Sequence, residues 1–380
     1  MHRIPEASFR EFETTKAICG ELEAMGAEVI KWDDLTGATG LIRASRPGPV
    51  IGIRADIDAL PIEEPGSGLG VSAHPGYMHA CGHDGHAATA LAVGKWFAEN
   101  RDRLFGSLKL IFQPGEETMP GGAREMLKRG VLESPHVDAI FALHTAPDID
   151  IGRIGVCAGE FLVGVQKFSL EMKCAGGAGF APEEGKDGIL LAAEFITSLQ
   201  ARLNRRLPPD RPGLVTIGTI NGGDYAGALA PSVRMEGVMR SFNRTTMLAL
   251  PELIEEAAKE IVGPASGSVS MECGSAYPPV WNDPDAAMLV YRSARECLGP
   301  DGVIYRTGPM AGSDDMSIFL EHVPGCYFLW GIREPGQKVR RAHTPEFGFP
   351  PEALDSSVRV MISTVEAALD CKWKGGNNHW

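Results

Sequence analysis

Strand and helix patterns alternate through the first part of this chain, and that alternation restricts the fold to a small number of architectures. The expected elements are helix Glu6–Met25, strand Val50–Ala55, helix His86–Phe97, strand Leu108–Phe112, helix Gly122–Arg129 and strand Ala139–Leu143. Strands separated by helices usually form parallel sheets with both faces covered. The sequence therefore predicts an α/β domain with a mainly parallel sheet and helices on both faces.

A different pattern begins near residue 164 and interrupts this domain. It consists of strand Gln166–Lys173, helix Gly185–Leu203, strands Val215–Ile220 and Val233–Arg240, helix Leu248–Ile261 and strand Ser266–Glu272. This order is typical of a small α+β domain with two helices on one face of an antiparallel sheet. The first pattern then resumes with helix Asp285–Cys297, strand Cys326–Gly331 and helix Pro351–Leu369. We therefore expect a discontinuous first domain, residues 1–163 and 275–380, and an inserted domain, residues 164–274.

The charge of the chain argues against two classes of partner. A net charge of -13 and a pI near 5.3 disfavour binding to nucleic acid or to an anionic membrane. No run approaches the roughly 18 apolar residues of a membrane-spanning helix, and the N-terminal residues lack the hydrophobic region of a signal peptide. We expect a cytoplasmic protein whose partners include neither nucleic acid nor a membrane.

The segment Met78–His86 concentrates groups that bind metal ions: a thiol, three imidazoles and a carboxylate. Cys81 and His83 can both reach one ion at about 2.0 to 2.3 Å. An isolated Cys and His at this spacing are more often a buried Cys beside a helix-capping His. Here the surrounding groups favour a metal site. Asp58 and Asp84 are candidates to orient the ligand imidazoles, because metal-bound His usually donates its other N–H to a carboxylate or carbonyl.

Two adjacent carboxylates, Glu116 and Glu117, follow the strand Leu108–Phe112. Such a pair at a strand end is often only a solvated turn. Near a metal ion the two can divide the work, because one can bind the ion while the other takes a proton from the attacking water. The spacing does not say which glutamate has which role.

Two histidines are weaker candidates when each is taken alone. His144 directly follows the strand Ala139–Leu143, and His343 lies in a loop closed by Pro345. A lone histidine is usually structural. Their assignment therefore depends on the other candidates and on resemblance to known proteins.

Other reaction classes have little support in the sequence. The chain contains no G-x-x-x-x-G-K-[ST] motif, and no G-x-G-x-x-G run follows its first strand. A thiol enzyme that uses Cys81 and His83 is an alternative, but two positions on one loop give poor geometry for a thiolate and its base.

Taken together, the motifs resemble the amidohydrolase branch of the aminoacylase/carboxypeptidase metallopeptidases. That branch includes N-acyl-amino-acid amidohydrolases, hippurate hydrolases and indole-acetyl-amino-acid hydrolases. The similar segments are His2–Glu6, Arg54–Pro61, His79–Asp84, Phe112–Glu117, Gly312–Ser317 and His343–Pro345.

This resemblance implies a site, a cofactor and a substrate. The implied ligands of two divalent metal ions are Cys81, His83, Glu117, His144 and His343, with Glu116 as the general base and later the acid. The implied metal is Mn or Zn, with Co or Ni as alternatives, and the implied substrate is a small N-acyl amino acid. The inserted domain would be a lid, through which such proteins commonly form homodimers, with a tetramer as an alternative.

Three positions in the inserted domain bear on the substrate. Arg240 matches the family's lid arginine and is a candidate to bind the substrate carboxylate, the alternative being a surface arginine. Ala178 stands where the family has a histidine thought to stabilise the oxyanion, and Ala228 stands where it has an asparagine. Loss of one oxyanion donor costs about 10² to 10³ in rate. A catalytically weakened protein that binds acyl amino acids is therefore an alternative. A dipeptidase or carboxypeptidase of the same family is another, although no feature of the sequence indicates recognition of a free amino or peptide end.

Overall fold

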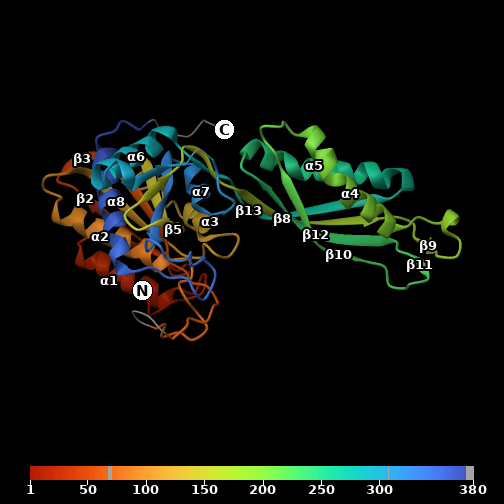
Figure 1. Cartoon of the computed structure of the whole chain (residues 1–380), viewed down its shortest axis with the longest axis horizontal. Coiled ribbons are helices and arrows are strands. Elements are labelled where there is room, and N and C mark those ends of the chain that lie inside the picture. Colours follow the sequence, from red (N-terminus) through yellow and green to blue (C-terminus); the bar gives the residue numbers. More distant parts are fainter. Residues whose placement is uncertain (67–70, 307, 374–380) are drawn as a thin grey trace. The chain divides into compact units, whose positions relative to one another are not determined.

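The computed structural model describes residues 1–66, 71–306 and 308–373, which divide into two compact units (Figure 1). The first unit is formed by the described residues of 1–161, 280–309 and those from Asp314 onward. The second is formed by Leu162–Pro279 with Met310–Ser313. Each unit has its own sheet and its own apolar core.

An eight-stranded sheet runs through the first unit. Its strands lie in the order β1 (Glu28–Lys31), β2 (Ala38–Arg43), β4 (Phe105–Gln113), β3 (Arg46–Asp56), β5 (Ala139–Asp150), β16 (Gly325–Arg333), β6 (Ile154–Val156) and β15 (Val303–Tyr305). The central strands β4, β3, β5 and β16 pair in parallel, whereas β1 and β2 add an antiparallel edge. The prediction of a mainly parallel sheet is confirmed.

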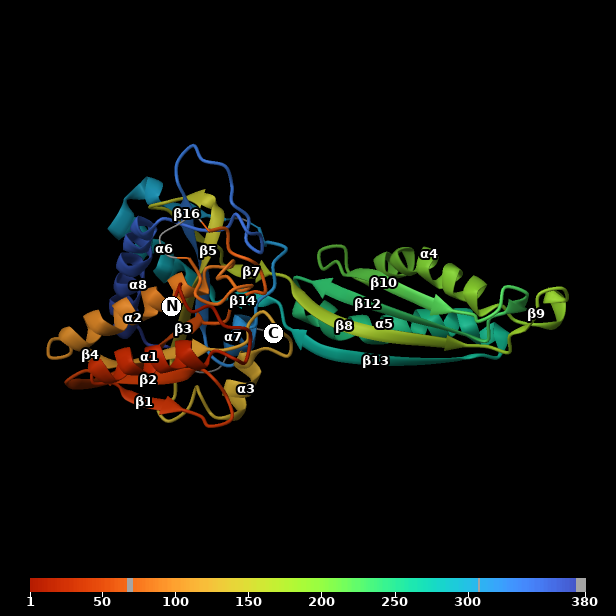
Figure 2. The ribbon, with the colours of Figure 1, turned by 90° about the horizontal axis from the view of Figure 1, so that it is seen from below.

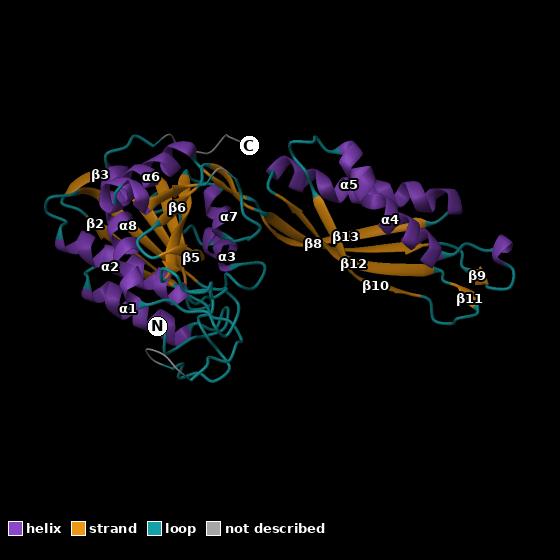
Figure 3. Cartoon of the chain, in the orientation of Figure 1, coloured by secondary structure: helices purple, strands orange, loops and turns teal. Residues whose placement is uncertain are grey.

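Helices cover both faces of this sheet (Figure 3). One face carries α1 (Phe12–Ala24), α2 (His83–Glu99), α6 (Pro284–Leu298) and α8 (Leu354–Leu369), and the other carries α3 (Gly122–Lys128) and α7 (Met316–Leu320). The prediction that the first helix begins at Glu6 is wrong. The helix begins at Phe12 because Glu6 lies before the helix and serves as its cap. The Glu6 carboxylate accepts the N–H groups of Glu13 and Thr14, which have no partner within the first turn.

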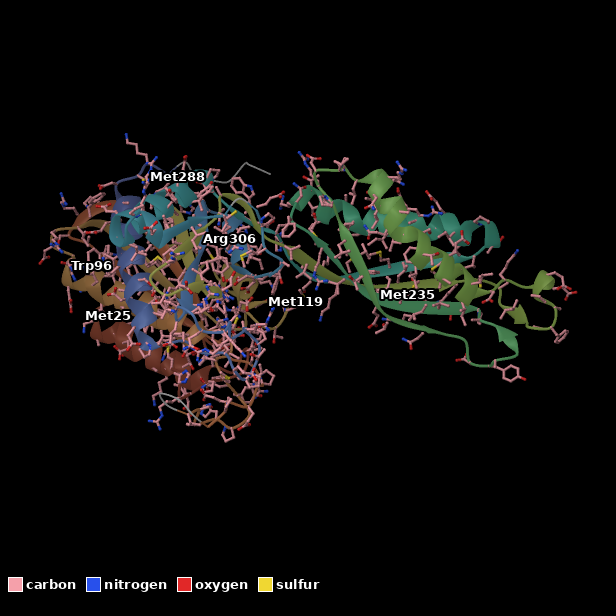
Figure 4. The ribbon with its side chains drawn as sticks, viewed as in Figure 1. Met25, Trp96, Met119, Met235, Met288 and Arg306 are labelled. Atoms are coloured by element: carbon pink, nitrogen blue, oxygen red, sulfur yellow. The ribbon has the colours of Figure 1, made fainter. Side chains whose placement is uncertain are left out.

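The second unit contains a four-stranded antiparallel sheet covered on one face by two helices (Figure 2). The sheet order is β10 (Leu214–Gly222), β12 (Ser232–Ser241), β8 (Gly164–Lys173) and β13 (Ser268–Tyr277), and the helices are α4 (Gly188–Arg206) and α5 (Arg244–Val262). On β8 the buried Phe168, Leu170 and Met172 alternate with more exposed polar residues. Met235 of β12, which Figure 4 labels, belongs to the same core. The predicted α+β fold is confirmed, whereas the bounds 164–274 and the lid role stay predictions.

Short elements complete the described chain. Two-stranded sheets pair β9 (Gly177–Ala178) with β11 (Ala228–Leu229) and β7 (Gly159–Leu162) with β14 (Val280–Asn282). Short 3₁₀ helices cover Pro182–Glu184, Gly263–Ala265, Pro300–Gly302 and Pro351–Ala353. Among the described residues, none of the helices combines the length and the apolar composition that a membrane span requires.

Candidate metal centre

Three neighbouring strands bring predicted site residues to one edge of the first unit's sheet. β3 pairs in parallel with β4 on one side and with β5 on the other, so the three run in the same direction. Asp58 follows β3, Glu116 and Glu117 follow β4, and His144 lies within β5. Ligands of open α/β sheets usually bind outside the carboxyl ends of the strands.

Two unusual backbone conformations position the remaining candidates. Gly82, between Cys81 and His83, has a φ of +88°, and a Cβ there would lie 2.5 Å from the Thr145 side chain, so this turn requires glycine. His343 has a φ of 63°, which is uncommon for a residue other than glycine. Its N–H donates to the carbonyl oxygen of residue 80 at 2.9 Å, which ties the 343 loop to the turn that carries Cys81.

The candidate ligand atoms converge in three overlapping groups. Within each group the atoms lie within 4.8 Å of one another, and the groups are Cys81, His83 and His144; Cys81, Glu117 and His343; and His83, Glu116 and Glu117. Cys81 Sγ lies 3.4 Å from His144 Nε2, and Glu117 Oε1 lies 3.2 Å from His343 Nε2. The fold therefore gathers these six residues at one place, while their individual roles stay predictions.

Two of the imidazoles are oriented by main-chain carbonyls. His83 Nδ1 lies 2.9 Å from the carbonyl oxygen of Asp58, and His144 Nδ1 lies 2.8 Å from that of Thr145. Because a carbonyl oxygen can only accept, each Nδ1 carries a hydrogen, which leaves Nε2 as the ring atom that faces the other candidate ligands. Metal-binding histidines are commonly held in this way.

The centre fits divalent metal ions. His83 Nε2 is buried and has no hydrogen-bond partner among the described residues. Carboxylate oxygens of Asp56, Glu117 and Glu116 lie 3.7, 3.9 and 4.0 Å from it, too far for hydrogen bonds. A buried nitrogen without a partner is costly, and a cation between these groups would satisfy it. Thiolate, imidazole and carboxylate ligands suit Zn and related ions.

The charges of the centre suit the roles expected for Cys81 and Glu116. Burial raises the pKa of the Cys81 thiol, but His144 and hydrogen bonds from His144 and His343 outweigh it and bring the pKa to about 6. The thiolate is the form that binds metals. Burial, together with the carboxylates of Asp314 and Glu117, raises the pKa of Glu116 well above its ordinary value. Such a carboxylate is better suited to proton transfer near neutral pH.

Asp58 lies between His83 and the main chain of Glu117, while its supporting role stays a prediction. Its carboxylate accepts from Ser8 Oγ at 2.7 Å and from the Glu117 N–H at 3.0 Å. The other carboxylate oxygen lies 3.2 Å from His83 Nδ1. One buried side chain thus links His83 to the main chain of Glu117.

Asp84 has a different partner from the one expected. Its Oδ2 lies 2.8 Å from His2 Nδ1, and no contact with a candidate ligand imidazole is found for it in the described part of the chain. Consecutive residues of a helix point about 100° apart. Asp84 therefore faces away from His83, toward the N-terminal segment.

Sequence reasoning missed a buried polar layer beside the centre. Arg54 and Asp56 lie within the otherwise apolar strand β3, and Asp314 and Asp315 precede α7. The similarity of Gly312–Ser317 to a family motif pointed to the last two but assigned them no role. A stronger signal was available, because charged residues inside a buried strand are rare unless they are paired.

Glu11 is a second missed carboxyl group. It is fully buried and accepts from the Gly115 N–H at 2.8 Å, immediately before Glu116. Thr36 Oγ1 donates to its other oxygen at 2.5 Å. Burial is the main reason that the pKa of Glu11 rises to about 7.

The Glu11 pKa predicts a pH dependence of stability. The carboxyl of an unfolded glutamate has a pKa of about 4.3. Between about pH 4.3 and pH 7 the folded state therefore binds more protons than the unfolded state, and stability falls as pH rises. We expect this carboxyl to contribute a decline of up to about 1.4 kcal/mol per pH unit in that window. Glu11→Gln should remove that contribution, measured as the difference between urea unfolding curves of the two proteins at several pH values. If the free energies of unfolding of the two proteins differed by the same amount at every pH, this prediction would be contradicted.

The three inserted-domain candidates all belong to the second unit. Ala178 of β9 and Ala228 of β11 are direct partners across a two-stranded sheet. Arg240 lies near the end of β12 and is half-buried, opposite Leu214 on one neighbouring strand and Val165 on the other. The pairing of the two alanines was not foreseen, and contact of any of the three with a substrate stays a prediction.

Comparisons with known proteins match this chain to one family over most of its length. Residues 52–367 match the family model described as peptidase family M20/M25/M40. N-acetyl-L-cysteine deacetylase of Bacillus subtilis is 33% identical over 370 residues, covering 97% of this chain and 86% of that protein. IAA-amino acid hydrolase ILR1-like 2 of Arabidopsis thaliana is 33% identical over 379 residues, covering 99% of this chain and 85% of that protein.

A solved structure is similar to this chain over nearly its whole length. The YXEP protein of Bacillus subtilis, described as a dinuclear metal binding peptidase from the M20 family, superposes with a TM-score of 0.83 at 32% identity. The match covers 97% of this chain and 95% of that one.

Proposed function

This chain belongs to peptidase family M20/M25/M40 and is a hydrolase that acts on amides, and from that premise we propose that it cleaves N-acyl amino acids or similar small amides. The observation that carries the proposal is Glu116, a buried carboxylate with an oxygen within 4.8 Å of possible ligand atoms of His83 and Glu117. The printed names of the deacetylase and amino acid hydrolase relatives support this substrate class.

The proposed metal site consists of two divalent ions, Mn or Zn, or else Co or Ni. The residues that would hold them are Cys81, His83, Glu117, His144 and His343. When bound, the ions would polarise the amide carbonyl and lower the pKa of a water molecule to about 7.

The protein side chains would then do the following. Glu116 takes the proton of the attacking water and returns it to the leaving amine, because a carboxylate with a raised pKa can both accept and release a proton near neutral pH. Asp58 keeps His83 in one tautomer and orientation. Arg240 is the proposed partner of the substrate carboxylate, since a guanidinium can bind a carboxylate through two hydrogen bonds.

The test is turnover of a panel of N-acetyl, N-benzoyl and indole-acetyl amino acids with added Mn²⁺ or Zn²⁺. We expect hydrolysis that stops with a chelator and returns when metal is restored. Activity that survives the chelator and is lost on alkylation of Cys81 would instead indicate a thiol enzyme. Cleavage of free dipeptides in preference to the whole panel would indicate a dipeptidase or carboxypeptidase.

A second candidate function rests on the Ala178–Ala228 pair, which stands where the family has a histidine and an asparagine. Without these donors the protein would bind acyl amino acids but hydrolyse them slowly. On this hypothesis Ala178→His should raise kcat by about 10² to 10³, since that is the usual effect of one oxyanion donor. Unchanged kcat, with efficient turnover by the unmodified protein, would show that another group serves the oxyanion.

The remaining expectations concern assembly and place in the cell. We propose that residues 164–274 act as a lid and dimerisation domain and that the protein is a cytoplasmic homodimer or tetramer. Light scattering of the full chain tests the assembly, and a monomer at all concentrations would contradict it.

A further inference from the structure

A buried chain of hydrogen bonds connects the surroundings of Glu116 with the segments that carry Cys81 and His144. Arg54 lies at its middle, with a side chain that is 1% exposed. Its guanidinium donates to Asp56 Oδ2 and Gln113 Oε1, each at 2.8 Å, and to Asp315 Oδ1 at 2.9 Å.

On one side the chain reaches the pocket of Glu116. Asp314 Oδ1 lies 3.2 Å from Arg54 Nη2, and carboxylate oxygens of Asp314, Asp315 and Glu116 lie within 4.8 Å of one another. Asp315 also accepts from the Ala123 N–H at 3.0 Å, so its position is fixed from two directions. A shift of Arg54 would therefore move the carboxylates beside Glu116.

On the other side the chain reaches two candidate ligands. Asp56 Oδ1 lies 2.6 Å from His86 Nδ1, and the Thr145 N–H donates to His86 Nε2 at 3.0 Å. Because a main-chain N–H can only donate, His86 Nε2 must accept and Nδ1 carries the hydrogen. The Thr145 hydroxyl then donates to the carbonyl oxygen of Cys81 at 2.7 Å, and the Thr145 carbonyl oxygen accepts from His144 Nδ1 at 2.8 Å.

Stability alone is a weak explanation for this arrangement. Buried ion pairs are often no more stable than apolar residues of similar volume, because desolvation offsets the attraction. The residues of the chain come from five segments, β3, β4, α2, β5 and the start of α7. They link the groups expected to bind metal to the group expected to move protons.

We propose that Arg54, Asp56 and His86 form a positioning relay that holds the Cys81–His144 pair and the Glu116 pocket in fixed relative positions. The part that concerns Glu116 rests on the proposed reaction, whereas the part that concerns Cys81 and His144 rests only on the proposed metal site. Loss of a partner outside the ligand set typically weakens metal binding or activity about 10- to 100-fold.

The test uses two complementary variants of the full chain. His86→Asn keeps a donor toward Asp56 and removes the acceptor of the Thr145 N–H, and His86→Gln does the reverse. Affinity for Zn²⁺ and Mn²⁺ is measured by competition with a chelating dye, together with the metal content, the melting temperature, and kcat and KM at saturating metal. We expect affinity about 10- to 100-fold weaker in both, and a lower kcat with little change in KM.

Thr89→Val is the matched control. Thr89 lies on the same helix and its buried hydroxyl contacts Ser357 Oγ at 2.8 Å, away from the relay. This variant should lose stability but keep the metal affinity of the unmodified protein. The relay is refuted if either His86 variant folds and also keeps that affinity. If the unmodified protein cleaves no amide but the affinity differences hold, the proposed function fails and the relay stands.

Discussion

Glu116→Gln should lower kcat by about 10² to 10⁴ while leaving the metal content of the protein unchanged. Glutamine has nearly the same size and shape as glutamate, so the pocket around this buried side chain is preserved. It cannot take the proton of the attacking water or deliver a proton to the leaving amine. Because this interaction matters in the transition state more than in substrate binding, KM should change little.

Glu117→Gln is the matched control for that variant. The two glutamates are adjacent, but Glu117 lies 3.2 Å from His343 and in one group with Cys81, whereas Glu116 lies in one group with Asp314 and Asp315. We therefore expect Glu117→Gln to lose bound metal, measured by elemental analysis. If Glu116→Gln loses metal and Glu117→Gln keeps it, the two roles are exchanged.

The sequence predicted those elements that have a strong apolar pattern. Most of β3 is buried on both faces, and its residues Val50–Ala55 read as one apolar run apart from Arg54. The edge strand β1 was not predicted because Glu28–Lys31 is largely exposed, and only its pairing with β2 makes it a strand. Local pattern thus predicts long apolar runs well and edge elements poorly. The short strand β2 was also missed, although its residues Ala38–Ile42 are buried.

The site residues also differ in how far they could be predicted from the sequence. Cys81 and His83 could be proposed from the cluster of thiol and imidazole groups in Met78–His86, and the two glutamates from their place after the strand Leu108–Phe112. His343 could be found only by resemblance, since its place depends on a left-handed backbone and a hydrogen bond to residue 80. The pairing of Asp84 with His2 was not foreseen, because His2 lies far away in the sequence. Long-range pairing of this kind has no local signature.

Arg54→Met should destabilise the protein by about 3 to 5 kcal/mol, because it leaves buried carboxylates without their cation. Asp56, Asp314 and Asp315 all lie within 3.2 Å of the guanidinium, and each is at most 3% exposed. Arg43→Met is the matched control, since Arg43 pairs with Glu28 at 2.7 Å but both side chains are more than half exposed. An exposed pair is worth about 0 to 1 kcal/mol. The measurement is urea unfolding of both variants and the unmodified protein.

The pH dependence of the stability lost in Arg54→Met distinguishes the loss of a charge from the loss of packing. Burial raises the pKa of Asp56, but Arg54 and His83 outweigh it and hold the pKa well below its ordinary value. A depressed pKa contributes stability above the unfolded value of about 3.9, and that contribution is lost as pH falls through the folded value. The penalty of Arg54→Met should therefore be largest near neutral pH and shrink as pH falls below about 4, because Asp56 then becomes protonated. A penalty that stays constant with pH would mean that the variant lost only packing, and that Arg54 is not the cation that balances these carboxylates.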